Sequence, residues 1–445
     1  MPKSIIVLGA GRSSAVLIEY LAKTCRENQW ALTVGDYSLD ASRKMTDGLP
    51  GISAIRFDIT NKAESSNTIR NSDVVVSLLP AHLHHLVADL CMEHGKHLVT
   101  ASYVSEEMKA FHQQAKEKNL LFLNECGLDP GIDHMSAMQL IDKIKKGGGS
   151  IISFESFTGG LISPETDPAN PWRYKFTWNA RNVVMAGQGT AKYIEHGEFK
   201  YIPYQQLFAR LTPVHVPGHG DYEGYANRDS LKYISAYGLD SVKTMLRGTL
   251  RYKGFCSAWN VLVQLGCCDD TYETENIRNM THADFTRSFL PGRKNQSVKT
   301  GVSTQTGLKE NSKEMKMLEW AGLFSDEPVG LEKGTPAQVL EHILNKKWKL
   351  APGDKDQIVM WHRFVFEMGG KQREVQASLI ATGDDNVHTA MAKTVGLPLG
   401  IAAKLLALGK IKNRGVAIPT TPEFYDPILS ELATFGIELQ EREML

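Results

Sequence analysis

The sequence has few cysteines, no excess of either charge and no long apolar run. Its six cysteines are scattered and lack the spacing of a metal site, which predicts reduced thiols in a cytosolic, cytoplasmic protein that holds no metal. Fifty basic residues balance fifty acidic ones, so we expect neither nucleic acid nor an anionic membrane as a partner. No apolar run approaches the ~20 residues that span a bilayer.

The 445 residues, 42% apolar and 22% charged, have the composition of a globular protein, and their number predicts two or three domains. We find no internal repeat and no low-complexity segment. The first apolar run is short and is followed by Gly9 and Gly11. It therefore fits a first strand better than a secretory signal.

Short apolar runs alternate with amphipathic stretches over the first ~130 residues. This alternation predicts a Rossmann-type, doubly wound parallel sheet, because parallel strands covered on both faces are apolar almost throughout. The predicted strands are Ser4–Leu8, Ala31–Val34, Ala54–Phe57, Asp73–Leu79, His97–Thr100 and Leu120–Leu123.

The pattern changes after residue 131. We expect a helix over residues 136–146, which ends at three glycines and has Asp133 as its N-cap. Strand-like runs among polar loops follow to about residue 253, and a mostly helical region then extends to about residue 350. The last part is predicted to hold a β-hairpin, a helix interrupted near Pro398, a final helix and a short strand.

A glycine-rich turn, GAGRSS, connects the first strand to the first helix. Gly9 allows a tight turn, and Gly11 lets the backbone approach a pyrophosphate at the positive end of the helix. Ser14 is small enough for the place of the third glycine in a dinucleotide fingerprint. We therefore expect these residues, with Arg12 and Ser13 between them, to bind a dinucleotide.

An acidic residue, Asp36, ends the second strand and is followed by Tyr37. A carboxylate there accepts hydrogen bonds from the ribose hydroxyls and repels a 2′-phosphate, which favours NAD over NADP. NADP stays possible, since Arg43 and Lys44 lie about a turn further on. The alternative is a Rossmann-shaped domain without nucleotide, in which Asp36 caps a helix.

Further candidate residues follow the later strands, because ligands of open α/β sheets collect beyond the carboxyl ends of the strands. Asp58 and Ile59 follow the third strand, where the adenine is expected. Leu79 follows the fourth strand, and Ala101 and Ser102 follow the fifth. The sixth strand leads into the polar stretch NECGLDPGIDHM, so this stretch is expected at the ligand edge.

Six irregular motifs together resemble the saccharopine dehydrogenases of the glutamate-forming type, and most closely the saccharopine dehydrogenase half of the bifunctional aminoadipic semialdehyde synthase. The similarity extends from the first strand to the end of the chain. The motifs are VTASYVSEEM (99–108), GLDPGIDHM (127–135), NPWRYKFTWN (170–179), YANRDS (225–230), LRGTLRYKGF (246–255) and MAKTVGLP (391–398).

The resemblance implies an enzyme of lysine metabolism. It would oxidise saccharopine to glutamate and 2-aminoadipate 6-semialdehyde with NAD or NADP, or catalyse the reverse reaction, and the direction is open. The family implies a homodimer with three parts. These are a dinucleotide-binding Rossmann domain of residues 1–130 and 388–445, an α/β domain for substrate and dimer contacts of residues 131–253 and 354–387, and a helical domain of residues 254–353.

The resemblance also implies site residues. Ala101 and Ser102 would contact the cofactor, and Ser102 and Tyr103 the substrate. The nicotinamide side would be lined by Leu128, Asp129 and Pro130, with Asp129 reaching the substrate. Trp178 would border the cofactor. The residues implied to hold substrate carboxylates, for which arginine forks are well suited, are Arg228, Thr249, Leu250 and Arg251.

The reaction requires a neutral secondary amine before hydride leaves the adjacent carbon, so a proton must be removed. Asp129 and Tyr103 are the candidates near this nitrogen, although Asp129 is equally able to bind the ammonium form without proton transfer. We interpret His134 as a structural histidine at a helix start. The three histidines of PAHLHHL are interpreted as solvated rather than metal-binding.

Two other functions remain open. A related carbon–nitrogen dehydrogenase of the carboxynorspermidine or homospermidine type acts on substrates with more amines, and would need acidic side chains at Arg228 and Arg251. A non-catalytic NAD-binding interaction protein would keep the glycine turn, but would not need the NRDS and RGTLR motifs.

Overall fold

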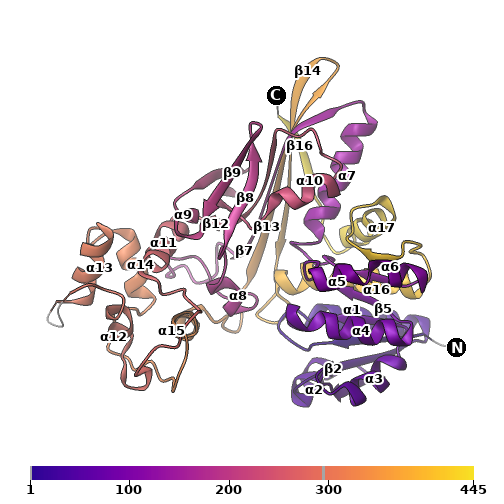
Figure 1. Cartoon of the computed structure of the whole chain (residues 1–445), viewed down its shortest axis with the longest axis horizontal. Helices are drawn as coiled ribbons and strands as arrows, with labels where there is room; N and C mark the ends of the chain where they lie inside the picture. Colours follow the sequence, from indigo (N-terminus) through magenta and orange to yellow (C-terminus); the bar gives the residue numbers. More distant parts are fainter. Residues whose placement is uncertain (1–2, 293–295, 445) are drawn as a thin grey trace. The chain divides into compact units, whose positions relative to one another are not determined.

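The structure is a computed structural model that describes residues 3–292 and 296–444. The chain divides into two compact units, Met1–Ile151 with Phe366–Leu445 and Ile152–Val365. In Figure 1 the first unit combines the indigo N-terminal elements with the yellow C-terminal ones. The C-terminal segment therefore returns to the first unit.

The first unit contains a seven-stranded sheet with the order β15-β6-β5-β4-β1-β2-β3. All neighbouring strands are parallel, which confirms the predicted doubly wound sheet. Strands β1, β4, β5 and β6 are almost wholly buried, as expected of parallel strands covered on both faces, whereas the edge strand β3 has no buried residue. The strands are β1 (Ser4–Leu8), β2 (Ala31–Asp36), β3 (Ile52–Arg56), β4 (Val74–Ser77), β5 (His97–Thr100), β6 (Leu121–Leu123) and β15 (Gly415–Ala417).

Helices connect these strands. Ser38 caps helix α2 through its hydroxyl, and Gly95 ends α4 in the left-handed conformation. The helical segments are α1 (Ala15–Asn28), α2 (Leu39–Thr46), α3 (Lys62–Arg70), η1 (Ala81–Leu83), α4 (His84–His94), α5 (Glu106–Ala110), α6 (His112–Glu117), α7 (Ile132–Lys146), α16 (Ala390–Ala407) and α17 (Pro422–Ala433).

Helix α16 continues through Pro398, so the predicted interruption is wrong. Proline removes one backbone hydrogen bond, but α16 packs against α1, α17, β4 and β5, and burial of the helix offsets that loss. By length and composition α16 is the one described helix able to cross a membrane, and 78% of it is buried inside the protein.

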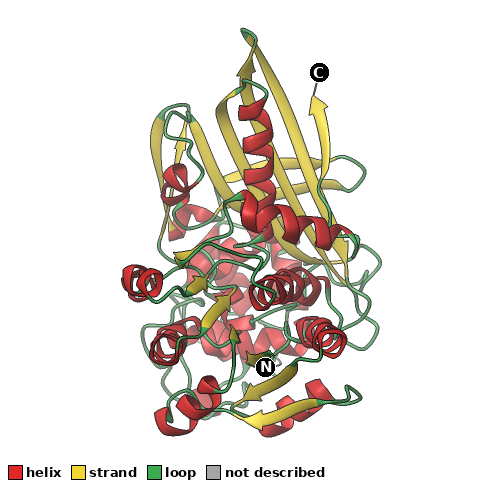
Figure 2. Ribbon diagram, turned by 90° about the vertical axis from the view of Figure 1, so that its right-hand side faces the viewer, coloured by secondary structure: helices red, strands yellow, loops and turns green. Residues whose placement is uncertain are grey.

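A second, mixed sheet has nine strands, with the order β10-β11-β12-β7-β13-β14-β16; β8 pairs with β12 and β9. Figure 2 shows its long strands as yellow arrows. The predicted hairpin is confirmed as β13 and β14, joined at Gly369 and Gly370. The strands are β7 (Ser150–Ile162), β8 (Thr190–Glu195), β9 (Glu198–Pro203), β10 (Leu211–Val216), β11 (Gly220–Ala226), β12 (Thr244–Tyr252), β13 (Asp356–Met368), β14 (Lys371–Thr382) and β16 (Gln440–Met444).

The second unit is helical between β12 and β13, as predicted. Trp259 and Trp348 of this helical region pack with Trp172, which precedes β12, in an aromatic core. The predicted three-part division of the chain stays a prediction. The helical segments are α8 (Ala180–Val184), α9 (Tyr204–Leu207), η2 (Ser230–Lys232), α10 (Tyr233–Ala236), α11 (Phe255–Leu265), η3 (Ile277–Asn279), α12 (His282–Arg287), α13 (Val298–Thr306), α14 (Lys313–Trp320) and α15 (Pro336–Trp348).

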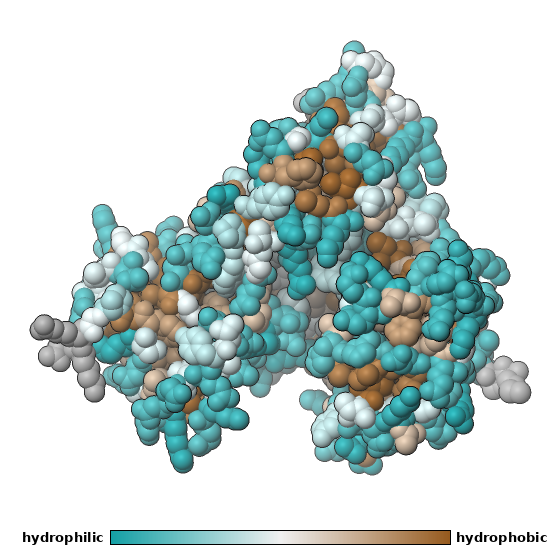
Figure 3. Space-filling model, viewed as in Figure 1, coloured by the Kyte–Doolittle hydropathy of each residue, from teal (hydrophilic) through white to brown (hydrophobic). Residues whose placement is uncertain are grey.

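Hydrophilic residues cover most of the face drawn in Figure 3, with apolar residues in scattered patches. Among the described residues, eight large apolar side chains are exposed, and Tyr37 is the most exposed of them at 68%. Scattered apolar side chains are normal on a protein surface. Tyr37 is noteworthy because it follows strand β2, at the edge where the sequence places the cofactor.

Candidate active site

The glycine turn after β1 has the predicted geometry. Gly9 has a φ of 104°, and its N–H donates to Gly35 O at 2.8 Å. A Cβ atom on Gly11 would meet no protein atom within 4 Å, so the protein's own packing does not require glycine there. A ligand that approaches the backbone would require it, which fits a dinucleotide pyrophosphate. Ser14 is buried just before α1, and Arg12 and Ser13 are at least partly exposed.

Asp36 connects the end of β2 to this turn. Its carboxylate accepts hydrogen bonds from Ala10 N–H at 2.8 Å and from Ser38 N–H at 2.9 Å. The N-cap of α2 is Ser38 and not Asp36. Beside it, the guanidinium carbon of Arg56 lies 5.2 Å from the ring centre of the exposed Tyr37.

The predicted adenine-side residues lie beyond β3. Asp58 accepts hydrogen bonds from the hydroxyl and the N–H of Thr60, at 2.7 and 3.0 Å, and these bonds lower the pKa of Asp58. Ile59 is buried. Leu79, two residues beyond β4, is half-buried. These residues therefore lie beyond the carboxyl ends of the parallel strands, where the sequence places them.

The histidines of PAHLHHL differ from the prediction. His82 is exposed, but His84 is only 4% exposed, so the expectation of solvated histidines is wrong for His84. Its ring nitrogens contact the hydroxyl oxygens of Ser77, Ser102 and Thr100. The cause is the start of α4 at His84, which directs this side chain toward the ends of β4 and β5.

Tyr103 and Asp129, the predicted catalytic pair, lie together. The Tyr103 hydroxyl donates to Asp129 Oδ1 at 3.4 Å. Tyr103 and Asp129 are half-buried, whereas Leu128 and Pro130 beside Asp129 are buried. Ala101 and Ser102 precede Tyr103 and are half-buried. The loops after β5 and β6 therefore bring the two predicted groups within hydrogen-bond reach.

A turn holds the Asp129 loop in place. Gly127 N–H donates to Pro130 O at 3.0 Å, and Ile132 N–H donates to Gly127 O at 2.8 Å. A Cβ atom on Gly131 would lie 2.0 Å from Gly127 O, so no other residue fits at this position. Gly131 is therefore needed to close the loop that carries Asp129.

Three buried titratable side chains, those of Glu125, Asp133 and His134, lie next to this loop in the sequence. His134 is fully buried, and its Nε2 lies 2.8 Å from Glu125 Oε2; its structural role stays a prediction, which this contact supports. Glu125 also accepts Val104 N–H at 3.1 Å. Asp133 is not the N-cap of α7. The helix begins at Ile132, and the Asp133 carboxylate instead accepts Gly131 N–H at 2.6 Å, because the turn places the helix start four residues before the predicted one.

In the second unit, Arg251 is buried among aromatic rings. Its guanidinium carbon lies 5.1 Å from the ring centres of Tyr174 and Phe255, and 5.7 Å from that of Tyr225. Arg251 donates to Leu250 O at 2.8 Å, but its buried Nε has no hydrogen-bond partner and it pairs with no carboxylate among the described residues. A buried guanidinium in this state fits a negatively charged ligand.

The other residues predicted to bind substrate carboxylates differ in how exposed they are. Leu250 is buried and Thr249 half-buried on β12. Arg228 is exposed and has a left-handed φ of 49°. Arg247, which was not among the expected site residues, is buried, with its guanidinium carbon 4.2 Å from the ring centre of Tyr233. Two arginines of the RGTLR motif are thus stacked on tyrosine rings.

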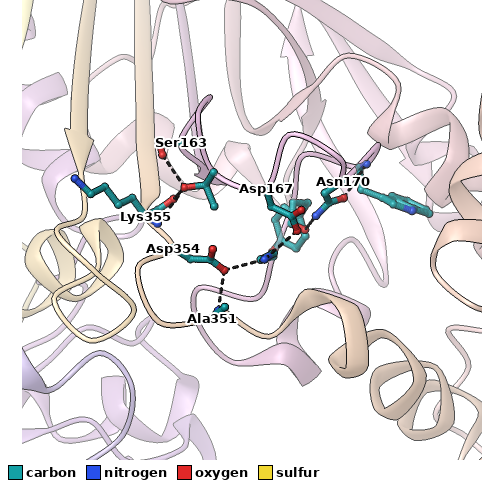
Figure 4. Close-up of polar contacts among 10 residues, drawn as sticks. Ser163, Asp167, Asn170, Ala351, Asp354 and Lys355 are labelled. Atoms are coloured by element: carbon teal, nitrogen blue, oxygen red, sulfur yellow. Dashed lines mark hydrogen bonds and ion pairs between the residues drawn. The ribbon is translucent and has the colours of Figure 1, made fainter.

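The segment NPWRYKFTWN is anchored by a buried lysine. Lys175 Nζ lies 2.9 Å from Asp167 Oδ2 and 2.8 Å from Asp354 Oδ2, and Asp354 also accepts Ala351 N–H. Figure 4 shows Asp167, Asp354 and Ala351 in this contact network. Tyr174 next to Lys175 borders Arg251, and burial raises the pKa of Tyr174 to about 12. Trp178 at the end of the segment is half-buried.

Three residues of these clusters were missed by sequence reasoning. His84 and Glu125 lie within stretches that the sequence analysis discusses. His84 was interpreted as a solvated histidine, and Glu125 was given no role. Lys175 lies inside a recognised motif, without a role. A charged or polar residue inside an otherwise apolar run, such as Glu125 after LLFLN, is the signal that was available.

Comparisons with known proteins match the chain from end to end. The family model described as "Saccharopine dehydrogenase NADP binding domain" matches residues 5–123, and "Saccharopine dehydrogenase C-terminal domain" matches residues 127–437. Saccharopine dehydrogenase [NADP(+), L-glutamate-forming] of Schizosaccharomyces pombe is 32% identical over 98% of both chains. The protein of that name in Saccharomyces cerevisiae is 31% identical over 99% of both.

The mouse mitochondrial alpha-aminoadipic semialdehyde synthase is 34% identical over 98% of this chain, which spans only 47% of that longer protein. Among solved structures, the apo histidine-tagged saccharopine dehydrogenase (L-Glu forming) from Saccharomyces cerevisiae aligns with a TM-score of 0.89 and 29% identity over 100% of both chains. Family models, full-length relatives and fold agree, so the chain belongs to the saccharopine dehydrogenase family.

Proposed function

We propose that the chain is a glutamate-forming saccharopine dehydrogenase, an oxidoreductase of lysine metabolism that interconverts saccharopine with glutamate and 2-aminoadipate 6-semialdehyde. One observation carries the proposal. A hydroxyl and a carboxylate, those of Tyr103 and Asp129, lie 3.4 Å apart beyond strands β5 and β6, in a chain that is similar over its full length to enzymes of that name.

The reaction assigns work to this pair. Saccharopine has a secondary amine, and hydride leaves the carbon next to it only when the amine is neutral. A nicotinamide cofactor held at the glycine turn would supply the hydride acceptor for this step. Asp129 either removes the proton or holds the ammonium form, and Tyr103 donates to the Asp129 carboxylate and so orients it. After oxidation, water attacks the imine carbon, and the same two groups are in place to move its protons.

The substrate carboxylates are assigned to the second unit. Arg251 is the main group, because its buried guanidinium has no carboxylate partner among the described residues. Thr249, Leu250 and Arg228 complete the set. Arginines at these positions argue against a substrate with additional amines. A buried arginine without a carboxylate partner among the described residues is also not needed by a non-catalytic nucleotide-binding protein.

The cofactor is a nicotinamide dinucleotide, held by the glycine turn and by residues after the strands. These residues are Gly9, Gly11, Arg12, Ser13, Ser14, Asp36, Tyr37, Asp58, Ile59, Leu79, Ala101, Ser102, Leu128, Asp129 and Pro130; the resemblance adds Trp178, which lies before α8.

NADP is proposed over NAD, against the preference predicted from Asp36. The family model and both fungal relatives name NADP. Both oxygens of Asp36 accept backbone N–H groups, which reduces the repulsion of a phosphate. The exposed Arg56 stacked on Tyr37 supplies a cation for that phosphate.

The test mixes purified protein with saccharopine and NADP or NAD, and follows absorbance of the reduced cofactor. We expect turnover with NADP to exceed turnover with NAD. Arg56→Met should lower kcat/KM for NADP about 10-fold, through the loss of one charge-assisted contact, and leave NAD unchanged. No turnover with either cofactor would refute the enzyme assignment, and equal effects on both cofactors would refute the role of Arg56.

The homodimer and the cytosolic location are likewise proposals. All six cysteines are free and buried, which is the state expected of thiols in a reducing compartment. Sedimentation of the purified protein tests the dimer.

A further inference from the structure

A buried imidazole joins three hydroxyl groups at the carboxyl ends of β4 and β5. His84 Nδ1 lies 3.0 Å from Ser77 Oγ, the side chain that ends β4. His84 Nε2 lies 2.8 Å from Ser102 Oγ and 3.2 Å from Thr100 Oγ1. Of the residues in this network, Ser102 is assigned to the cofactor and the substrate, whereas His84 has no assigned role.

We propose that His84 is a positioning residue of the active site, whose imidazole fixes the direction of the Ser102 hydroxyl toward the bound cofactor and substrate. This inference rests on the proposed function, because that function gives Ser102 its ligands. His84 itself lies behind Ser102 and acts only through it.

The backbone of Ser102 is already fixed by other contacts. Its N–H donates to Thr100 Oγ1 at 3.2 Å, and its carbonyl accepts Glu125 N–H at 3.1 Å. The remaining freedom of Ser102 is rotation about its χ1 angle, which has three staggered positions. The 2.8 Å contact with Nε2 selects one of them, so His84 sets where the hydroxyl oxygen lies.

The imidazole does this as a neutral group. Burial, and secondarily the charge of His82, lower the pKa of His84 to about 4. At neutral pH the ring therefore has one N–H donor and one acceptor nitrogen. Hydroxyl groups adapt to either arrangement, because each is both a donor and an acceptor. A neutral ring also adds no positive charge beside the Ser102 hydroxyl.

On the side of His84 away from Ser102, the described residues give the network no path to solvent. Ser77 and Thr100 are buried, with exposures of 0% and 1%, and Ser77 ends the chain of contacts inside the sheet. A proton passed from Ser102 to His84 would reach only these two buried hydroxyl groups. The contacts therefore favour positioning of the hydroxyl over conduction of protons.

A purely structural role for His84, as a tie between β4, β5 and α4, makes a different prediction for two conservative variants. In His84→Gln the side-chain amide reaches the position of Nε2 and can hold Ser102. In His84→Asn the amide reaches only the position of Nδ1 and holds Ser77. If His84 were only a structural tie, both variants would keep their activity or both would lose it. If His84 positions Ser102, His84→Gln should keep activity and His84→Asn should lose it.

The experiment measures kcat and KM with saccharopine and NADP for wild type, both variants and the control His85→Asn, which changes the neighbouring half-buried histidine. We expect His84→Asn to lower kcat about 10- to 100-fold, as for a misplaced active-site group. His84→Gln should recover most of that loss, and the control should match wild type. Equal losses in the two His84 variants, or full kcat in both, would overturn the proposal.

A second readout does not depend on turnover. The ¹⁵N resonances of the His84 ring in the cofactor-free protein should change in Ser102→Ala, because that variant removes the partner of Nε2. NADPH affinity, from fluorescence titration, should fall in His84→Asn and be restored in His84→Gln. An unchanged ring spectrum, or equal affinity in the two variants, would refute the inference. If wild type fails to oxidise saccharopine, the proposed function falls and these measurements still decide the role of His84.

Discussion

The charged side chains near the candidate site make different kinds of contact in the two units. In the first unit, carboxylates are held by hydrogen bonds: Asp36 by two backbone N–H groups, and Glu125 by Val104 N–H and His134. In the second unit, arginines lie on aromatic faces, as Arg251 does on Tyr174. Backbone donors occupy a carboxylate, but an aromatic face leaves the in-plane donors of a guanidinium free.

The difference indicates what each unit can do with a ligand. Carboxylates whose oxygens are already bonded serve to place loops, and the loops then present Tyr103 and Asp129. An arginine on aromatic rings keeps its charge and part of its donor set for an anion. The contacts thus hold loops in place in the first unit and leave a guanidinium able to bind an anion in the second.

The largest expected effect is on Asp129. Asp129→Ala should lower kcat about 10²- to 10⁴-fold, the usual contribution of a group that moves a proton in the transition state. Tyr103→Phe should lower kcat less, and the double variant should resemble Asp129→Ala alone, since the two groups act together. Steady-state kinetics of the four proteins checks this. Additive losses would show that the 3.4 Å contact has no role in catalysis.

Arg251 comes next. Arg251→Met keeps an apolar chain between the rings and removes the charge, so kcat/KM for saccharopine should fall about 10²- to 10³-fold, the range found for a buried charged partner. The KM for NADP should not change. Arg210→Met, at an exposed arginine of the same unit, is the control. A similar loss for NADP would place Arg251 outside the substrate contacts.

The third prediction concerns stability of the first unit. Glu125→Gln removes one charge from the buried pair with His134, and should lower the free energy of unfolding by about 3 kcal/mol. Glu106→Gln, at an exposed pair with Lys109, should change it by less than about 1 kcal/mol. Urea unfolding followed by circular dichroism measures both. Equal values would mean that the buried pair contributes no more than the exposed one.

The smallest effect depends on pH. Hydrogen bonds to Glu19 and then to Asp385 raise the pKa of the partly exposed His388. Because the folded pKa is the higher one, this stabilisation is complete below the unfolded pKa, near 6.5, and is lost as pH rises through the folded pKa. His388→Gln should therefore lower the Tm more at about pH 5 than at about pH 9. A constant difference in Tm would contradict this assignment.

Most strands of the first unit can be predicted from the local sequence pattern. Fewer contacts of the candidate site can be predicted in this way. The parallel strands are continuous apolar runs, so each is recognisable alone. Asp129 and Tyr103 came from the resemblance, and their 3.4 Å contact joins residues 26 positions apart. His84 was misread because a polar residue at a helix start is usually solvated, and its burial depends on the loops after two other strands.

The sequence by itself determined the alternation of strands and helices over the first ~130 residues, the glycine turn and the family, because these depend on neighbouring residues and on short motifs. Tertiary structure alone decided that α16 runs unbroken through Pro398, that Asp133 bonds to Gly131 N–H, and that Arg251 lies in an aromatic cage. Each of these outcomes is set by burial and by partners distant in the chain. Their free energies outweigh local preference.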